Sequence, residues 1–338
     1  MLDIFKSRLF ETTTLTASIN DQQYVPSYIN DLGLFEEQGV STTSVVIERQ
    51  GSTIAVLPTS ARGAPGTPIQ GDKRKGIPLL IPHVKATAQL QADEVQNVRA
   101  FGSPDQLAGV TQKRDEKTRK ISSSLDLTLE YHRLGCIQGL VLDEDGSVIL
   151  DIFDAMGIEE LDEITIAPDA TYDPNNPAKA GAIRQKLRGL KRETSKALGF
   201  KPKGWLCFAG DDLYDQVADA PEVRATYLAQ QQASDLRSDG DAESFTYGGI
   251  TFVNYVGAGD VAIDDDVGRI VPLGVPGLFR TDFGPADYLE AVNTNGLPKY
   301  MKAVMDPSGY NRFIEMEGQM NDLNYCTKPQ ALRKLRLA

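Results

Sequence analysis

The side chains that could carry chemistry are few in this chain of 338 residues. It has two histidines, His83 and His132, and three cysteines, Cys136, Cys207 and Cys326, with no Cys-x-x-Cys spacing. His132 and Cys136 lie four residues apart in a segment that we predict to be helical, so they could form half of a metal site. No third ligand is close to them in the sequence, and we expect a packed core pair instead. The cysteine spacing predicts reduced, buried thiols rather than disulfides.

Two other segments match parts of known binding motifs but lack their context. Residues 257–262 (GAGDVA) have the glycine spacing of a dinucleotide-binding turn, but no helical pattern follows, and Asp264, Asp265 and Asp266 would repel a pyrophosphate. The three aspartates could collect a divalent cation, although a solvated acidic loop is the better interpretation. Residues 71–76 (GDKRKG) lack the Gly-Lys-Ser/Thr ending of a phosphate-binding loop. We therefore expect no cofactor, no metal and no enzyme.

The composition is that of a globular protein, with 41% hydrophobic and 24% charged residues. Acidic residues number 47 and basic residues 35, which gives a formal charge of −12 at pH 7. A surface of this sign does not grip nucleic acid phosphates. No apolar run approaches the roughly 18 residues of a membrane span, and the charged opening decapeptide is not a signal peptide. These observations exclude a nucleic-acid-gripping protein and a membrane-spanning protein.

The N-terminal part is predicted to be an arm followed by strands. Residues 1–10 have the spacing of a short amphipathic helix. Residues 11–40 carry isolated apolar anchors without a sustained period, which indicates an extended arm that docks single side chains; an ordinary loop is the alternative. Strand-like patterns follow at 44–48, 53–57 and 83–91.

The most irregular segment is 58–82, which holds five prolines and four glycines. Its charged side chains are mostly basic: Arg62, Lys73, Arg74 and Lys75, against Asp72. A loop of about 20 residues without its own core is uncommon in a compact domain. Taken as a hairpin, residues 50–88 would reach roughly 60 Å when extended, compared with a radius of gyration of about 20 Å for a globule of this length. Such an arm could lie on a neighbouring subunit; a surface loop is the alternative.

A long helix is predicted over 105–138. Its middle, 111–120, is polar on every side, so we expect this part to project away from the core. Apolar and neutral side chains in the second half share one face, which should dock: Ile121, Leu125, Leu129, His132 and Cys136, broadened by Leu127 and Leu134. One end of the helix is therefore expected to dock while the other projects.

The rest of the chain alternates short strands and helices, the pattern of a mixed α+β fold. The expected elements are a hairpin at 140–153, a helix at 180–199, a strand at 203–210, helices at 211–231 with a break at Pro221, and a hairpin at 244–256. An acidic stretch covers 151–163, and a change of composition near 170–180 predicts a boundary between substructures. Near the C-terminus, Ile314, Met316 and Met320 alternate with polar residues as in a half-buried strand.

An ordered set of short motifs spans roughly residues 200–338. It comprises Pro202-Lys203-Gly204-Trp205, a helix, Tyr-Gly-Gly at 247–249, Leu-Pro-Lys at 297–299, Asp306-Pro307, Arg312-Phe313 and the closing Leu337-Ala338. In this order and spacing the set resembles the lambda-type phage major capsid proteins, whereas the N-terminal half is similar in architecture only. The resemblance implies an α+β Hong Kong 97-type capsid fold.

The resemblance also implies a domain map. An N-terminal arm would be 1–40, an extended loop (E-loop) 50–88, an axial (A) domain 171–295, and a peripheral (P) domain 41–49, 89–170 and 296–338, with the spine helix at 105–138. The E-loop residues expected at the subunit interface are Arg62, Lys73, Arg74, Lys75, Ile77 and Leu79. Their cations could pair with the acidic stretch of a neighbour.

The function implied by the resemblance is self-assembly of hexamers and pentamers into the icosahedral head of a tailed double-stranded DNA phage. Assembly would occur in the host cytoplasm, and the protein would end in the virion. Separate scaffold, portal and decoration proteins are the expected partners, and the DNA would be enclosed without sequence-specific binding. The alternatives are an encapsulin-like cellular compartment, a tail-tube protein and an unrecognised enzyme.

Overall fold

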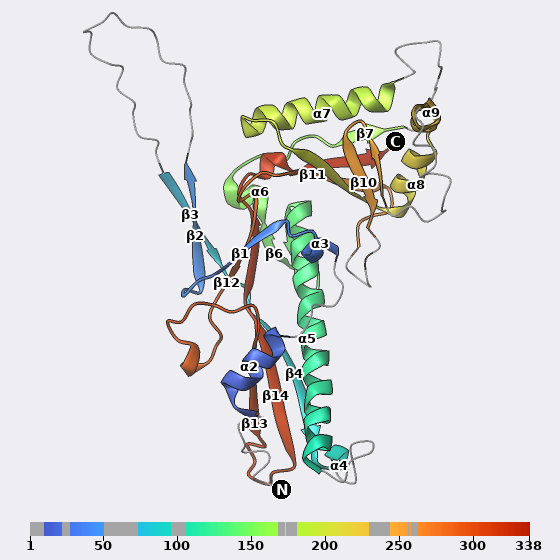
Figure 1. Cartoon of the computed structure of the whole chain (residues 1–338). Coiled ribbons are helices and arrows are strands. Elements are labelled where there is room, and N and C mark those ends of the chain that lie inside the picture. The colour runs from blue at the N-terminus through green and yellow to red at the C-terminus, as the bar shows by residue number, and fades with distance from the viewer. Residues whose placement is uncertain are drawn as a thin grey trace, which may run out of the picture.

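The structure of the chain is a computed structural model that describes residues 10–21, 28–50, 74–95, 106–167, 173, 181–229, 244–255, 257 and 262–338. Figure 1 shows an elongated molecule built along the helix α5 (Gln106–Gln138), with a second group of helices and strands above the C-terminal end of α5. The hairpin of β2 (Ser44–Gln50) and β3 (Arg74–Leu80) leaves the body of the molecule at the left of the view. The predicted helix at 105–138 is confirmed.

The N-terminal half of α5 lies on an antiparallel sheet of β13 (Tyr300–Met305), β14 (Phe313–Met320) and β4 (Val84–Gln91). Our expectation that this half of the helix projects is wrong. Arg114 and Thr118, in its polar middle, are both buried. The sheet beside this half of the helix carries small alanines, Ala86, Ala88 and Ala303. The aliphatic stem of an arginine can cover apolar surface while its charged end finds a partner.

The second half of α5 follows the prediction more closely. The side chains expected to dock are buried: Ile121, Leu125, Leu129, His132, Leu134 and Cys136. Leu127 is the exception and is 46% exposed. This half faces a sheet of β1 (Phe35–Gly39), β12 (Phe279–Phe283) and β15 (Asp322–Cys326), in which β12 is parallel to β1 and antiparallel to β15.

The predicted extended arm contains regular structure. The helix α2 (Thr12–Asn20) packs on β13, burying Leu15 and Ile19, and a single turn, α3 (Tyr28–Asp31), packs on α5. The arm therefore docks on its own subunit at these points. The threonine-rich start of α2 has a weak helix propensity, so burial of one face forms this helix rather than local preference. The expected helix at 1–10 falls almost wholly outside the described residues.

The upper part of the molecule is a six-stranded sheet covered by helices. In spatial order its strands are β7 (Ile164–Ile166), β16 (Arg333–Leu337), β11 (Val267–Leu273), β8 (Gly204–Ala209), β10 (Ile250–Asn254) and β9 (Ser244–Tyr247). The helices are α7 (Ala182–Leu198), α8 (Asp211–Asp219) and α9 (Pro221–Ala229). The predicted strand, the helices with their break at Pro221, and the 244–256 hairpin are confirmed. Gly199 ends α7 in the left-handed conformation that glycine favours.

Strand pairing crosses the boundaries of the expected domain map, which stays a prediction. β7 and β16 belong to the six-stranded sheet, although the expected map assigns both to the P domain. β12 lies in the range expected for the A domain but pairs with β1 and β15 beside α5. Composition along the chain does not reveal these crossings, because pairing partners are set by long-range packing.

Short elements complete the fold. The predicted turn around Gly146 is confirmed, and it joins β5 (Leu140–Leu142) to β6 (Val148–Asp151). The helix α6 (Ile152–Met156) follows directly, capped by the Asp151 carboxylate. The other short elements are α4 (Ala92–Val95), η3 (Leu289–Ala291) and η4 (Pro329–Ala331). The strand predicted at 53–57 lies outside the described residues.

Candidate assembly surfaces

The β2–β3 hairpin has two unlike faces. Because side chains alternate along a strand, the pairs Val45–Leu79 and Ile47–Ile77 lie on one face, and Val46 lies on the other, opposite Pro78. The first face packs on the core beside α5. On the second face Val46 is 58% exposed, and Leu80, which pairs with Ser44, is 79% exposed. The hairpin therefore presents apolar side chains that the described part of its own subunit does not cover.

This alternation corrects part of the predicted interface. Leu79 is buried in its own subunit and Ile77 is half-buried there, so neither is an exposed contact residue. Arg62 and Lys73 lie outside the described residues. Arg74 and Lys75 lie on β3, where only their backbone is described. Sequence reasoning did not single out the exposed Leu80, which the alternation of apolar side chains about Pro78 could have indicated.

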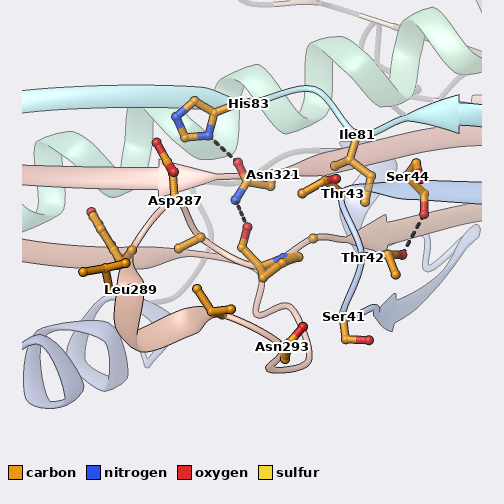
Figure 2. Close-up of a pocket in the computed structure, with 15 residues that line it drawn as sticks. Ser41, Thr42, Thr43, Ser44, Ile81, His83, Asp287, Leu289, Asn293 and Asn321 are labelled. Atoms are coloured by element: carbon orange, nitrogen blue, oxygen red, sulfur yellow. Dashed lines mark hydrogen bonds between the residues drawn. The ribbon is translucent and has the colours of Figure 1, made fainter.

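A cavity of about 880 Å³ lies where the hairpin joins the body, between residues 41–44, Ile81, His83 and the loop 284–293 (Figure 2). Asn321 closes one wall: its Oδ1 is 2.6 Å from Nδ1 of His83, and its amide donates to the Pro285 carbonyl at 2.8 Å. Leu289 lines the cavity and is 92% exposed. The cavity mixes hydroxyl, amide and apolar groups and contains no cluster of catalytic type.

The Pro-Lys-Gly-Trp motif positions have structural roles in the six-stranded sheet. Trp205 is buried in the core between that sheet and α7, and Pro202 is buried as well. Gly204 begins β8, and Lys203 is exposed beside it. The motif therefore sets the entry of a central strand.

The motif positions Asp306-Pro307 and Arg312-Phe313 shape the turn between β13 and β14. The Asp306 carboxylate accepts hydrogen bonds from the Ser308 amide at 2.8 Å and the Arg312 amide at 3.1 Å. The Ser308 hydroxyl and these amides lower the pKa of Asp306. Pro307 is exposed in this turn, and Phe313 is half-buried at the start of β14. The motif holds the tip of the sheet in one conformation.

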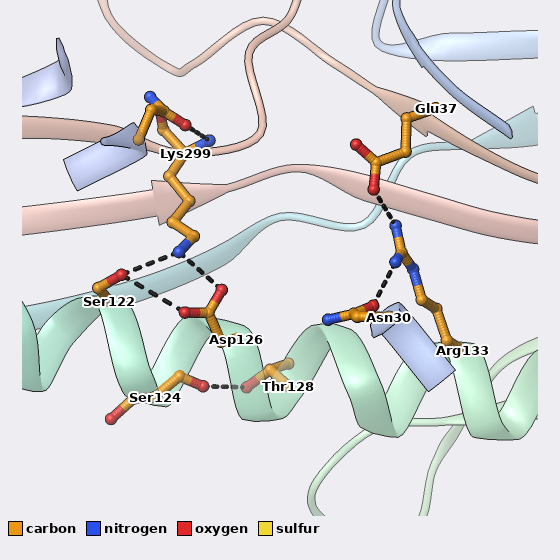
Figure 3. Close-up of polar contacts among 9 residues, drawn as sticks. Asn30, Glu37, Ser122, Ser124, Asp126, Thr128, Arg133 and Lys299 are labelled. Atoms are coloured by element: carbon orange, nitrogen blue, oxygen red, sulfur yellow. Dashed lines mark hydrogen bonds and ion pairs between the residues drawn. The ribbon is translucent and has the colours of Figure 1, made fainter. Parts of the chain in front are cut away.

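Buried polar contacts run along α5, and Figure 3 shows two of them. Nζ of Lys299 lies 2.6 Å from Oδ1 of Asp126, and their side chains are 3% and 1% exposed. The Lys299 ammonium also donates to the Ser122 hydroxyl at 2.8 Å. This pair fastens the loop before β13 to the helix. Sequence reasoning missed it, because a buried cation and its partner give no local signal.

A second cluster of polar contacts lies further toward the C-terminal end of α5, at Glu130 and Arg133. The Arg133 guanidinium donates to Glu37 at 2.7 Å and to Asn30 (Figure 3). It also donates to Thr281 at 3.2 Å. The Glu130 carboxylate accepts from the Ile29 amide at 2.9 Å. These contacts fix α3 and β1 against the helix.

The predicted histidine–cysteine pair is a core pair. Nδ1 of His132 lies 2.9 Å from the Asp322 carboxylate, and both side chains are buried. Burial alone would lower the pKa of His132, but Asp322 offsets it and the pKa is raised. Burial raises the pKa of the Cys136 thiol well above its usual value. No group of three potential metal ligands occurs among the described residues.

The acidic stretch 151–163 is partly used within its own subunit. Glu163 pairs with Lys334 at 3.1 Å, Glu160 lies 3.6 Å from Arg269, and Asp151 caps α6. Fewer of its carboxylates are therefore available for the E-loop of a neighbour than the sequence suggested.

Among the helices that the structure describes, we find no candidate for a membrane span, because none combines the necessary length with sufficient hydrophobicity.

A family model for phage major capsid protein E matches residues 11–337. The chain belongs to the phage major capsid protein E family. The major capsid protein of Salmonella phage Felix O1 (isolate Felix O1-VT1) is 25% identical to it over 367 residues, which cover 98% of this chain and 97% of the relative. The family makes the chain a structural protein of the capsid shell, and an encapsulin-like compartment is not favoured.

Solved structures agree on the fold of this family member. The mature capsid protein of bacteriophage PhiM1 is 12% identical and covers 94% of this chain and 89% of its own, with a TM-score of 0.50. A prophage protein from Escherichia coli CFT073 is also 12% identical, with a TM-score of 0.57 and coverage of 97% and 99%. The predicted Hong Kong 97-type α+β capsid fold is confirmed.

Proposed function

We propose that this capsid protein assembles as hexamers and pentamers into the icosahedral head of a tailed phage with a double-stranded DNA genome. The observation that carries the proposal is the β2–β3 hairpin, whose outer face exposes Val46 and Leu80. β3 lies within the proposed E-loop, residues 50–88, and β2 leads into it. This loop would lie across an adjacent subunit. An interface of the usual size buries about 1,600 Å², so each subunit would be held by several modest contacts.

The chain's charge suits a container for DNA. A wall with many phosphate contacts would hold DNA through counterion release, whereas a subunit with a net charge of −12 leaves the genome free to enter and exit. The proposed partners are therefore further copies of this chain, with separate scaffold, portal and decoration proteins, and assembly would take place in the host cytoplasm. No catalytic role is proposed.

Electron microscopy of the purified full-length chain tests this function. We expect closed icosahedral particles with six-fold and five-fold capsomers at high protein concentration or with a scaffold protein. A chain that stays monomeric under both conditions, or that forms open tubes, would contradict the proposal.

The basic residues of the E-loop allow a second test. Changing Lys73, Arg74 and Lys75 to Glu together should reduce the particle yield while the circular dichroism of the unassembled chain stays unchanged. Replacement of Arg74 and Lys75 by each other's residue type is the matched control, because it keeps the charge. Normal particles from the reversed variant would refute a role for these charges.

A further inference from the structure

The helix α7 has a strongly basic exposed face in an acidic protein. It carries six cationic side chains and one carboxylate, whereas the whole chain has a net charge of −12. Its apolar face is buried on the six-stranded sheet. Arg188, Arg192 and Lys196, which we call the α7 stripe, recur every four residues and are all exposed. In the part of the chain that the structure describes, none of these three side chains has an ion-pair or hydrogen-bond partner.

The positive charge around α7 also affects the pKa of a neighbouring lysine, Lys191. The Lys191 ammonium donates to the Gly248 carbonyl, and its pKa is lowered, first by burial and then by the positive charges of Arg188 and Lys201. Other cations of α7 are used within the subunit, such as Arg184, which donates to Thr226 at 3.0 Å. The α7 stripe is therefore the part of the helix whose charge is left for a partner.

The helix α8 has the opposite character. It contains four aspartates and no cation, and its buried face holds apolar side chains. Asp211, Asp212 and Asp215, which we call the α8 face, are exposed. The acidic loop at 264–266 lies against the start of this helix, where the Asp265 carbonyl accepts from the Leu213 amide at 2.9 Å. The exposed Asp264 and Asp265 of this loop therefore add negative charge beside the α8 face.

Both surfaces belong to one well-fastened unit. The Glu222 carboxylate of α9 accepts from the Ile183 and Arg184 amides at 3.0 and 3.1 Å, so α9 holds the start of α7. The same carboxylate accepts from the Tyr247 hydroxyl of β9. Figure 1 shows α7 along the upper border of this unit and α8 at its lower right. The two helices therefore lie at different borders of one subunit.

We propose that the α7 stripe of one subunit binds the α8 face of the next, head to tail around a capsomer. The inference rests on the proposed assembly into hexamers and pentamers. Contact between two different faces of identical subunits generates a ring when the rotation closes. Arg188 and Arg192 of α7 are four residues apart, and so are Asp211 and Asp215 of α8, so each pair of charges is spaced by about 6 Å along its helix and the two pairs match. The chain itself supplies the acidic partner, which favours a second copy over DNA phosphates.

A charge-swap experiment on the nuclease-treated, full-length chain tests the contact. One variant carries Arg188→Glu and Arg192→Glu, a second carries Asp211→Lys and Asp215→Lys, and a third carries all four changes. Opposed like charges should lower the particle yield of the first two variants about tenfold or more. The third variant restores opposite charges and should recover particles. The pair Arg188→Lys and Arg192→Lys, which keeps the charge, should assemble as the unchanged chain does.

The readouts are sedimentation and negative-stain microscopy, with circular dichroism to show that each unassembled variant is folded. Full yield from both two-residue variants would overturn the contact, and so would a four-residue variant that stays as poor as either of them, because the stripe would then serve another partner such as nucleic acid. Absence of particles from the unchanged chain would instead contradict the proposed function.

Discussion

Lys299 and Asp126 form an ion pair of 2.6 Å inside the protein, between the loop before β13 and the middle of α5. Both side chains are almost completely buried. Asn20 of α2 adds to the same junction, because its side-chain amide donates to the Lys299 carbonyl at 2.8 Å. The pair therefore joins the N-terminal helix, the spine helix and the C-terminal sheet at one point.

Removing one partner of this pair should be costly. Lys299→Met leaves the Asp126 carboxylate buried without its cation, and we expect a loss of about 3–5 kcal/mol in the free energy of unfolding. The double variant Lys299→Met with Asp126→Leu should be much less destabilised, because no buried charge is left. Urea unfolding of the unassembled chain measures both, and equal losses in the single and double variants would contradict this account.

The contact between α5 and its sheet depends on a missing side chain. A Cβ at Gly318 of β14 would come within 2.3 Å of Cγ2 of Ile121, so Gly318→Ala should overpack the interface and cost about 1–3 kcal/mol. Gly189→Ala in the interior of α7 is the control, since a Cβ there meets no atom within 4 Å. It should stabilise the chain by about 0.5–1 kcal/mol. Thermal unfolding distinguishes the two variants. A Gly318→Ala variant with an unchanged melting temperature would show that Ile121 moves aside without cost and would contradict this prediction.

The pair of His132 and Asp322 predicts a pH dependence of stability. The folded chain raises the pKa of His132 above its usual 6.5, chiefly because the Asp322 carboxylate outweighs burial, with Asp143 adding a smaller effect. The charged pair therefore contributes fully below the unfolded pKa, and its contribution is lost as the pH rises through the folded pKa. Melting temperatures between pH 6 and pH 9 should fall more steeply in the unchanged chain than in His132→Gln. Parallel curves would show that the pair does not titrate in this range.

Adjacent leucines on β3 should behave in opposite ways. Leu79→Ala removes a buried side chain and should cost about 2–5 kcal/mol of folding stability. Leu80→Ala truncates a side chain that is 79% exposed and should leave the melting temperature of the unassembled chain nearly unchanged. If the outer face of the hairpin contacts another subunit, Leu80→Ala should instead lower the particle yield. A Leu80→Ala variant with normal yield would remove this residue from the interface.

The sequence by itself determined much of the local architecture. The long helix, the 140–153 and 244–256 hairpins, the alternation at Ile314, Met316 and Met320, and the ordered C-terminal motifs all depend on neighbouring residues, and the structure confirms these elements. Periodicity and turn residues record such features directly, since burial of one face requires a repeat of 3.6 or 2 residues.

Only the tertiary structure decided which surfaces meet. The polar middle of α5 predicted a projecting segment, yet Arg114 and Thr118 are buried where the helix lies on the sheet of β4 and β14. The threonine-rich α2 became a helix because β13 covers it, and Lys299 found Asp126 from far along the chain. The orientation of Leu79 inward and Leu80 outward likewise follows from the register of β2 and β3. Such contacts join residues far apart in sequence, so their energies leave no periodic pattern in either segment alone.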